Sequence, residues 1–181
     1  MQDIFKEPLP KGHSQTVEWI ESVCNKIGKE ELAAPAIGSV NEKYNTALEY
    51  YRKALSEKRI AVLSTDMMEI DWALETLLDA GAEVISVDIM TMGRNCCPFY
   101  SRFSKQLNIR IGNDIREISG RIISEVPDLV IGHSMLTRGL PFKTCIIPQE
   151  CISHKASIYY LEYMSNILIA NEKEGWLSWG D

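Results

Sequence analysis

A regular alternation of apolar runs and helical patterns begins at Lys58 and continues through most of the remaining chain. The first run, residues 60–63, has four apolar side chains in succession and no polar face, which is typical of a strand buried on both sides. A helical pattern at 70–78 and a second apolar run at 84–89 follow it. This alternation predicts an α/β fold with a doubly wound, mostly parallel, Rossmann-like sheet.

The alternation extends to five strands. A weaker strand pattern at 108–111 is followed by a helix at 114–125 and a strong strand at 128–132. The fifth strand is predicted at 142–147. A long helix, 153–171, closes the fold and has Ser153 as its expected N-cap.

Two amphipathic helices precede the first strand. Ser14 or Thr16 is expected to cap the first, which ends at Gly28. A loop containing Pro35 and Gly38 then leads to the second helix, for which the pattern gives 40–56. Neither helix fits a strand–helix–strand unit.

A chain of 181 residues is long enough to bury one good core. We therefore expect residues 1–57 to form a lead-in and helices that pack on the domain. Residues 58–181 are expected to form the Rossmann-like unit itself.

Charge and hydropathy exclude several classes of protein. The net charge of -6 provides no basic surface for phosphates, which argues against nucleic-acid binding. No apolar run approaches the roughly 20 residues that a membrane span needs, and no secretion signal is present. The sequence therefore predicts a soluble, cytoplasmic protein that does not bind membranes.

Common nucleotide and hydrolase motifs are missing. The turn after the first strand, residues 64–69, has none of the glycines of the G-x-G-x-x-G fingerprint, so a dinucleotide site is not expected. The sequence contains neither a G-x-x-x-x-G-K-[ST] nor a G-x-S-x-G motif. ATPase and serine-hydrolase chemistry are therefore unsupported.

Polar residues follow several predicted strands, at the edge where ligands bind in open parallel sheets. We expect a cofactor site after the first and fourth strands and metal ligands after the second and fifth. The candidate cofactor-binding residues are Ser64, Asp66, His133 and Ser134. The candidate metal ligands are Cys96, Cys97 and Cys151.

Each candidate also has a purely structural interpretation. Thiolates and an imidazole suit an iron–sulfur or other metal cofactor, but free cysteine is commonly a small buried apolar residue. Cys24 and Cys145 are expected to pack in the core, and His133 could simply be a polar loop residue. Core packing is also expected for four methionines near strand ends, Met67, Met68, Met90 and Met92. The odd number of cysteines and the lack of a C-x-x-C pair argue against disulfides, a zinc ribbon and a thioredoxin-like motif.

Several short segments, in this order, resemble the nitrogenase component 1-type oxidoreductase family. Residues 10–16, PKGHSQT, resemble its P-x-G-x-x-x-T lead-in, and residues 57–62, EKRIAV, resemble its G-K-R-V-A-I strand. Residues 73–87 and the PDLVIG strand at 127–132 are similar to further family segments. Leu-Pro-Phe at 140–142 parallels the family's I-P-F, so the resemblance covers nearly the whole chain.

The resemblance implies a place in a larger assembly. Members have three Rossmann-like domains, pair as α2β2 oligomers and take electrons from an ATP-dependent iron–sulfur reductase. This chain resembles the last domain, whereas the cysteines of the bridging cluster lie in the first. The implied partners are therefore a homologous or paired component 1 subunit and the reductase, and the implied cofactor is an iron–sulfur or other metal group shared with other domains.

One position departs from nitrogenase itself. Its catalytic subunit has a cofactor-ligating histidine just after I-P-F, and counting on from Phe142 places Ile146 there. An aliphatic side chain cannot ligate a metal. The resemblance thus implies a nitrogenase-like oxidoreductase domain that binds part of a cofactor or substrate site. The alternative is a non-catalytic carrier or assembly scaffold for a metal cofactor.

Overall fold

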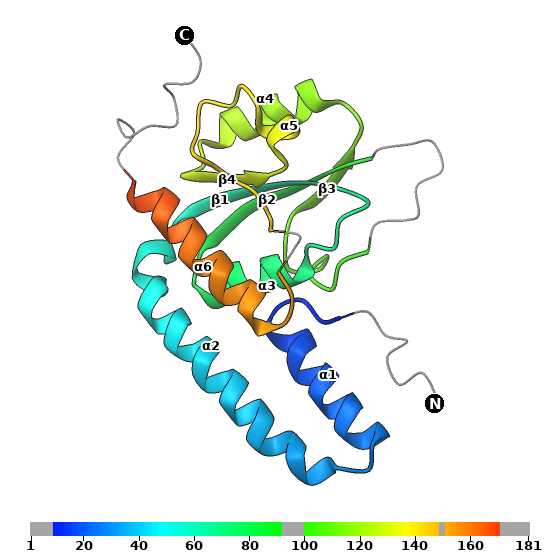
Figure 1. Ribbon diagram of the computed structural model, residues 1–181. Coiled ribbons are helices and arrows are strands. Elements are labelled where there is room, and N and C mark those ends of the chain that lie inside the picture. The colour runs from blue at the N-terminus through cyan, green and yellow to red at the C-terminus, as the bar shows by residue number, and fades with distance from the viewer. Residues whose placement is uncertain (1–8, 92–99, 149–150, 171–181) are drawn as a thin grey trace.

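The protein is described by a computed structural model that covers residues 9–91, 100–148 and 151–170. Five parallel strands form one sheet in the order β3-β2-β1-β4-β5, with helices on both faces (Figure 1). The predicted doubly wound, Rossmann-like sheet is confirmed. The strands are β1 (Arg59–Thr65), β2 (Glu83–Met90), β3 (Ile109–Gly112), β4 (Leu129–Gly132) and β5 (Thr144–Cys145).

The helices form two layers around the sheet. Helices α4 and α5 cover one face of the sheet, and α3 and α6 cover the opposite face (Figure 1). Helices α1 and α2 join the second layer, since α2 packs along α6. The helices are α1 (His13–Lys26), α2 (Ala33–Leu55), α3 (Asp71–Asp79), α4 (Ile115–Glu125), α5 (Ser134–Thr137) and α6 (His154–Ile169), with a short 3-10 turn at Glu30–Leu32.

Strand β1 lies at the centre of the core. Ile60 and Val62 belong to the larger apolar cluster beneath α3 and α6, whereas Ala61 and Leu63 belong to the smaller cluster beneath α4. This division follows from the alternation of side chains along a strand. It confirms that the apolar run at the start of the alternation is buried on both sides.

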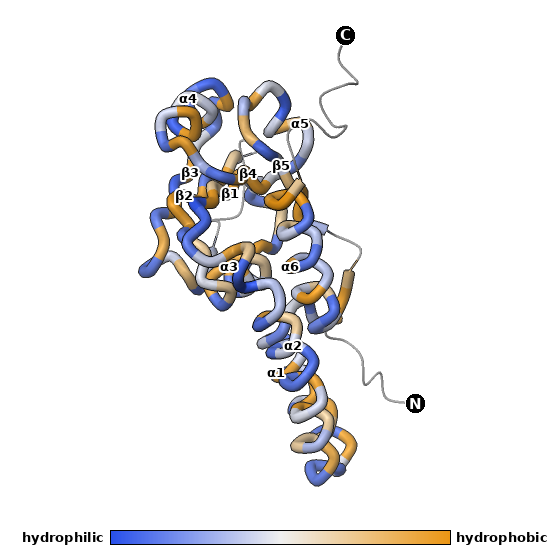
Figure 2. The backbone as a smooth tube through the Cα atoms, turned by 90° about the vertical axis from the view of Figure 1, so that its left-hand side faces the viewer, coloured by the Kyte–Doolittle hydropathy of each residue, from blue (hydrophilic) through white to orange (hydrophobic). Residues whose placement is uncertain are grey.

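Helix α2 begins earlier than predicted, at Ala33, so that Pro35 and Gly38 lie inside a helix and not in a loop. Pro35 is tolerated because the first amides of a helix have no acceptor within it. The apolar face expected of this amphipathic helix is confirmed: Tyr44 and Leu55 are buried, and Ala47, Leu48 and Tyr51 between them pack against the larger cluster. Figure 2 shows α1 and α2 extending beyond the sheet as a two-helix arm.

The predicted caps of α1 are wrong, because Gly12 occupies the N-cap position without a side-chain cap. Ser14 Oγ donates instead to Glu75, and Thr16 Oγ1 donates to the carbonyl of Gly12 at 2.6 Å. Gly12 has a φ of 81°, and a Cβ there would lie 2.6 Å from the Cβ of Trp72. Only glycine fits this close approach of α1 to α3.

Strand β5 is shorter than the predicted 142–147 and pairs only through Thr144 and Cys145. Its neighbour β4 ends at Gly132, and Ile146, which the register would place opposite Gly132, lies outside the ladder. The final helix agrees with the prediction at its start, because Ser153 is the N-cap and its hydroxyl accepts from the Lys155 amide. No helix in the described segments is both long and apolar enough to cross a bilayer.

A network of charged side chains fixes α4 on β2 and β3. Asp88 on β2 accepts from Arg110 Nη2 at 2.7 Å and from Arg121 Nη2 at 2.9 Å. Arg110 Nη1 also donates to Glu125 at 2.9 Å. Burial alone would raise the pKa of Glu125, but hydrogen bonds from Arg110 and Ser86 outweigh it and lower that pKa. The network places the guanidinium groups of Arg110 and Arg121 beside the buried carboxylate of Asp88.

Candidate functional site

The strand order places a topological switch point between β1 and β4. The chain passes from β1 to β2 and β3 on one side, and then returns across the sheet to β4 and β5 on the other. Loops that leave the two central strands in opposite directions open a crevice at their carboxyl ends, where ligands bind in such sheets. Of the predicted cofactor residues, Ser64 lies at the carboxyl end of β1, Asp66 follows that strand, and His133 and Ser134 follow β4.

The register of β1 and β4 brings these residues together. Leu63 pairs with Gly132, so Ser64 and His133 are the next residues along the two neighbouring strands. A Cβ on Gly132 would lie 2.5 Å from the carbonyl oxygen of Leu63, so glycine allows this close approach. We call Ser64, Asp66, His133 and Ser134 the switch-point edge.

Ser64 is fully buried at the carboxyl end of β1. Its hydroxyl has no hydrogen-bond partner in the described parts of the chain. Buried polar groups normally have such partners, so this hydroxyl has unused hydrogen-bonding capacity beside the crevice. Asp66 begins the following turn, and its backbone amide donates to the carbonyl of Met90 at 3.2 Å, which ties the turn to β2.

His133 is exposed and caps α5. Its Nδ1 accepts from the backbone amide of Met135 at 3.2 Å. In the neutral imidazole the proton therefore lies on Nε2, because one ring nitrogen donates and the other accepts. Coordination of a metal through Nε2 would need the other tautomer and would break the cap. As folded, His133 is a hydrogen-bond donor to whatever faces it.

Ser134 is exposed in the first turn of α5. This helix has only four residues, which is too short to show a helical period in the sequence. The structure places the predicted candidates near strand ends, as expected, but the sequence gave no sign that His133 would be held as a helix cap.

Exposed apolar side chains surround the switch-point edge. Met67, in the loop after β1, is 83% exposed, and Met135, in α5, is 80% exposed. Ile146, just beyond β5, is 47% exposed. The prediction that Met67 fills the core is wrong, whereas Met68 and Met90 pack against the two core clusters. Single exposed apolar residues are ordinary, but several on the loops of one sheet edge are typical of a surface that contacts something else.

The cysteines do not form a metal site in the described residues. Cys96 and Cys97 lie outside those residues, and Cys151 is half buried against the larger core cluster. No group of three or more histidine, cysteine, aspartate or glutamate side chains suitable for a metal occurs in residues 9–91, 100–148 and 151–170. Cys24 and Cys145 are buried as predicted, and burial raises the pKa of the Cys145 thiol far above its ordinary value. Cys145 therefore stays protonated and is a poor ligand.

Comparison with solved structures shows a shared fold. One structure titled "Nitrogenase Cp1 at pH 6.5" is 18% identical, with a TM-score of 0.64 over 91% of this chain and 41% of that chain. Another, "Nitrogenase Cp1 at pH 5", is 8% identical, with a TM-score of 0.68 over 88% of this chain and 40% of that chain. This chain thus spans about two-fifths of the length of these structures. No curated protein sequence matches it.

The family comparison covers most of the sequence. The model for the "Nitrogenase component 1 type Oxidoreductase" family matches residues 2–156. This range includes the switch-point edge, all five strands and the start of α6. The chain therefore belongs to the nitrogenase component 1-type oxidoreductase family and is an oxidoreductase-type α/β domain.

Proposed function

We propose that the switch-point edge forms one wall of a redox site shared with other domains of a nitrogenase-like oxidoreductase. The observation that carries this proposal is the meeting of Ser64 and His133 at the topological switch point. An unpartnered buried hydroxyl and an imidazole N–H lie there on neighbouring strands. Met67 and Met135 provide an apolar rim that a second domain can cover.

These residues fit contact with a bound group better than ligation of one. The Nε2–H of His133 can donate a hydrogen bond to a sulfide, carboxylate or carbonyl acceptor. The hydroxyl of Ser64 is fully buried and adds an unpartnered polar group at the neighbouring strand end. Asp66 can position a proton or a cationic part of a substrate. A metal–sulfur cofactor, when bound, would supply the electron-transfer chemistry, and its ligands would come from elsewhere in the subunit.

The partners in this proposal are a homologous or paired component 1 subunit and an ATP-dependent iron–sulfur reductase. Family membership supports both, because component 1 proteins act on electrons delivered by another protein. The exposed rim around the switch-point edge supports a covering surface on the first of these partners.

A second candidate is a carrier or assembly scaffold that holds a metal cofactor without turnover. Ile146 favours it, because an exposed isoleucine occupies the place at the end of β5 where the resemblance puts the nitrogenase cofactor histidine. The two candidates share the same surface and differ in whether electrons are accepted.

Anaerobic loading of the whole subunit with iron and sulfide, in the presence of its partner subunit, separates them. The enzyme proposal expects visible cluster absorbance and its bleaching when the reductase and ATP are added. Stoichiometric absorbance that no reductant bleaches would identify the carrier instead. A subunit that acquires no absorbance and accepts no electrons would rule out both.

A further inference from the structure

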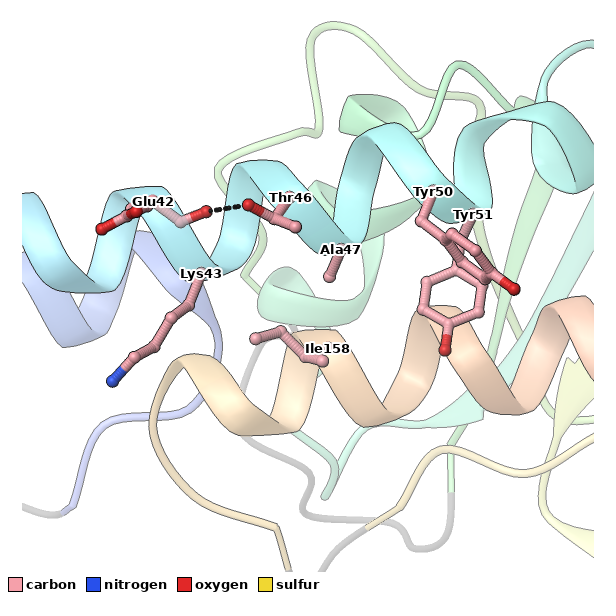
Figure 3. A pocket seen from close by; sticks show the side chains of 7 residues that line it. All are labelled: Glu42, Lys43, Thr46, Ala47, Tyr50, Tyr51 and Ile158. Carbon is pink, nitrogen blue, oxygen red and sulfur yellow. Dashed lines mark hydrogen bonds between the residues drawn. The ribbon is translucent and has the colours of Figure 1, made fainter.

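A groove with a volume of about 530 Å³ runs between helices α2 and α6. Figure 3 shows Ala47 of α2 and Ile158 of α6 facing each other between the two helices. Both side chains, and that of Tyr51, pack against the larger core cluster, so the floor of the groove belongs to the folded core. The residues that line the groove are Glu42, Lys43, Thr46, Ala47, Tyr50, Tyr51 and Ile158.

One end of the groove is aromatic, and an apolar surface continues from it along α6. Tyr50 is 78% exposed, and its ring meets that of Tyr51 edge to face with the centroids 4.9 Å apart. Ile169, in the last turn of α6, is 71% exposed. It falls on the same side of the helix as Ile158, because eleven residues make about three helical turns. Exposed tyrosines beside aliphatic side chains are typical of a surface that another group covers.

The chain itself supplies a segment that can cover this surface. Residues 171–181, NEKEGWLSWGD, follow α6 directly and lie outside the described residues. They include two tryptophans, Trp176 and Trp179. Ile158 lies twelve residues before Ala170, which is about 18 Å along a helix. Trp179 comes nine residues after Ala170 and can extend up to about 30 Å from it, so both indoles can reach the groove.

We propose that residues 171–181 fold back along α6 and that Trp176 and Trp179 cover the groove between α2 and α6. Each indole that docks removes roughly 150–250 Å² of its surface from water, which favours the contact. The exposed ring of Tyr50 gives these indoles an aromatic partner at the end of the groove nearer to the carboxyl end of α6.

The size of the groove favours one short segment over a second copy of the chain. Seven residues line it, whereas a stable dimer interface has about 20–30 residues on each side. The groove shares no residue with the switch-point edge, so the proposal does not depend on the proposed redox function.

Hydroxyl-radical footprinting of the full 181-residue chain, read by mass spectrometry, tests this contact. Tyr50 should be modified at least about 5-fold faster in the variant Trp176→Ala with Trp179→Ala than in the wild type, because the docked segment shields it in most molecules. Tyr100, which is 90% exposed and lies in the segment before β3, should react equally fast in both proteins.

The reverse variant changes the groove. Thr46→Glu with Tyr50→Glu places two carboxylates at exposed positions of its lining, and should speed the modification of Trp176 and Trp179 by at least about 5-fold. The control, Asn25→Glu with Asn45→Glu, adds the same charge at exposed positions outside the lining and should leave both tryptophans at the wild-type rate.

Equal rates at Tyr50 with and without the two tryptophans would overturn the proposal, as would tryptophans that react alike in the groove variant and its control. The wild type is also measured over an about 100-fold range of protein concentration, with its mass followed by light scattering. Protection of Tyr50 that does not change with concentration supports a contact within one chain. Protection that rises together with a dimer mass would assign the groove to a second copy and would overturn the proposal too.

Discussion

Replacing Asp88 with alanine is expected to lower the free energy of unfolding by about 3–5 kcal/mol. The Asp88 side chain is 1% exposed and accepts hydrogen bonds from both Arg110 and Arg121. Its removal leaves two partly buried guanidinium groups facing each other without the carboxylate between them. Because these groups hold α4 against β2 and β3, the helix should loosen together with the sheet edge. Urea unfolding at neutral pH, followed by circular dichroism, measures the change.

The matched control removes the other carboxylate of Arg121. Glu117 pairs with Arg121 one helical turn away, but its side chain is 71% exposed. Exposed pairs of this kind contribute little, so Glu117→Ala should change the free energy of unfolding by less than about 0.5 kcal/mol. Similar losses of unfolding free energy in the two variants would show that the buried ion pairs of Asp88 stabilise the fold no more than the exposed pair of Glu117 does.

Replacing His133 with asparagine is expected to slow electron uptake by the loaded whole subunit by about 10- to 100-fold. Asparagine keeps an acceptor at the start of α5 for the Met135 amide, so the cap survives. It does not reach as far as the imidazole and lacks the Nε2–H. The loss should therefore appear in the rate of reduction by the reductase, measured by stopped-flow absorbance, while the thermal midpoint stays near that of the wild type.

Asp128→Asn is the control at the opposite end of the same strand. Asp128 precedes β4, and its Oδ2 accepts from the Arg59 amide at 2.8 Å, a role that an asparagine oxygen can also fill. This variant should reduce at the wild-type rate. If His133→Asn is equally fast, His133 has no contact with the redox group.

The fold was predictable because its signals are local. The residues of β1 show four consecutive apolar side chains, and those of β4 show three, at 129–131. What could not be predicted depends on contacts distant in the sequence. Gly12 replaces the expected serine cap because Trp72 leaves no room for a Cβ, and the length of β5 depends on its pairing with β4, which is limited to two residues.

The site was predictable only as a set of positions. Ser64 and His133 were identified because they follow predicted strands, and the strand order then placed those strands next to each other. The sequence could not show that His133 caps α5 through Nδ1, which decides that it donates through Nε2.

Chemical protection of His133 tests most directly whether the switch-point edge faces the bound group. The whole subunit is treated with diethyl pyrocarbonate before and after anaerobic cofactor loading, and the modification of each histidine is followed by mass spectrometry. The account predicts that loading slows modification of His133 by at least about 10-fold, while exposed histidines elsewhere in the subunit are unaffected. An unchanged rate at His133 in a subunit that carries the full cofactor absorbance would contradict it.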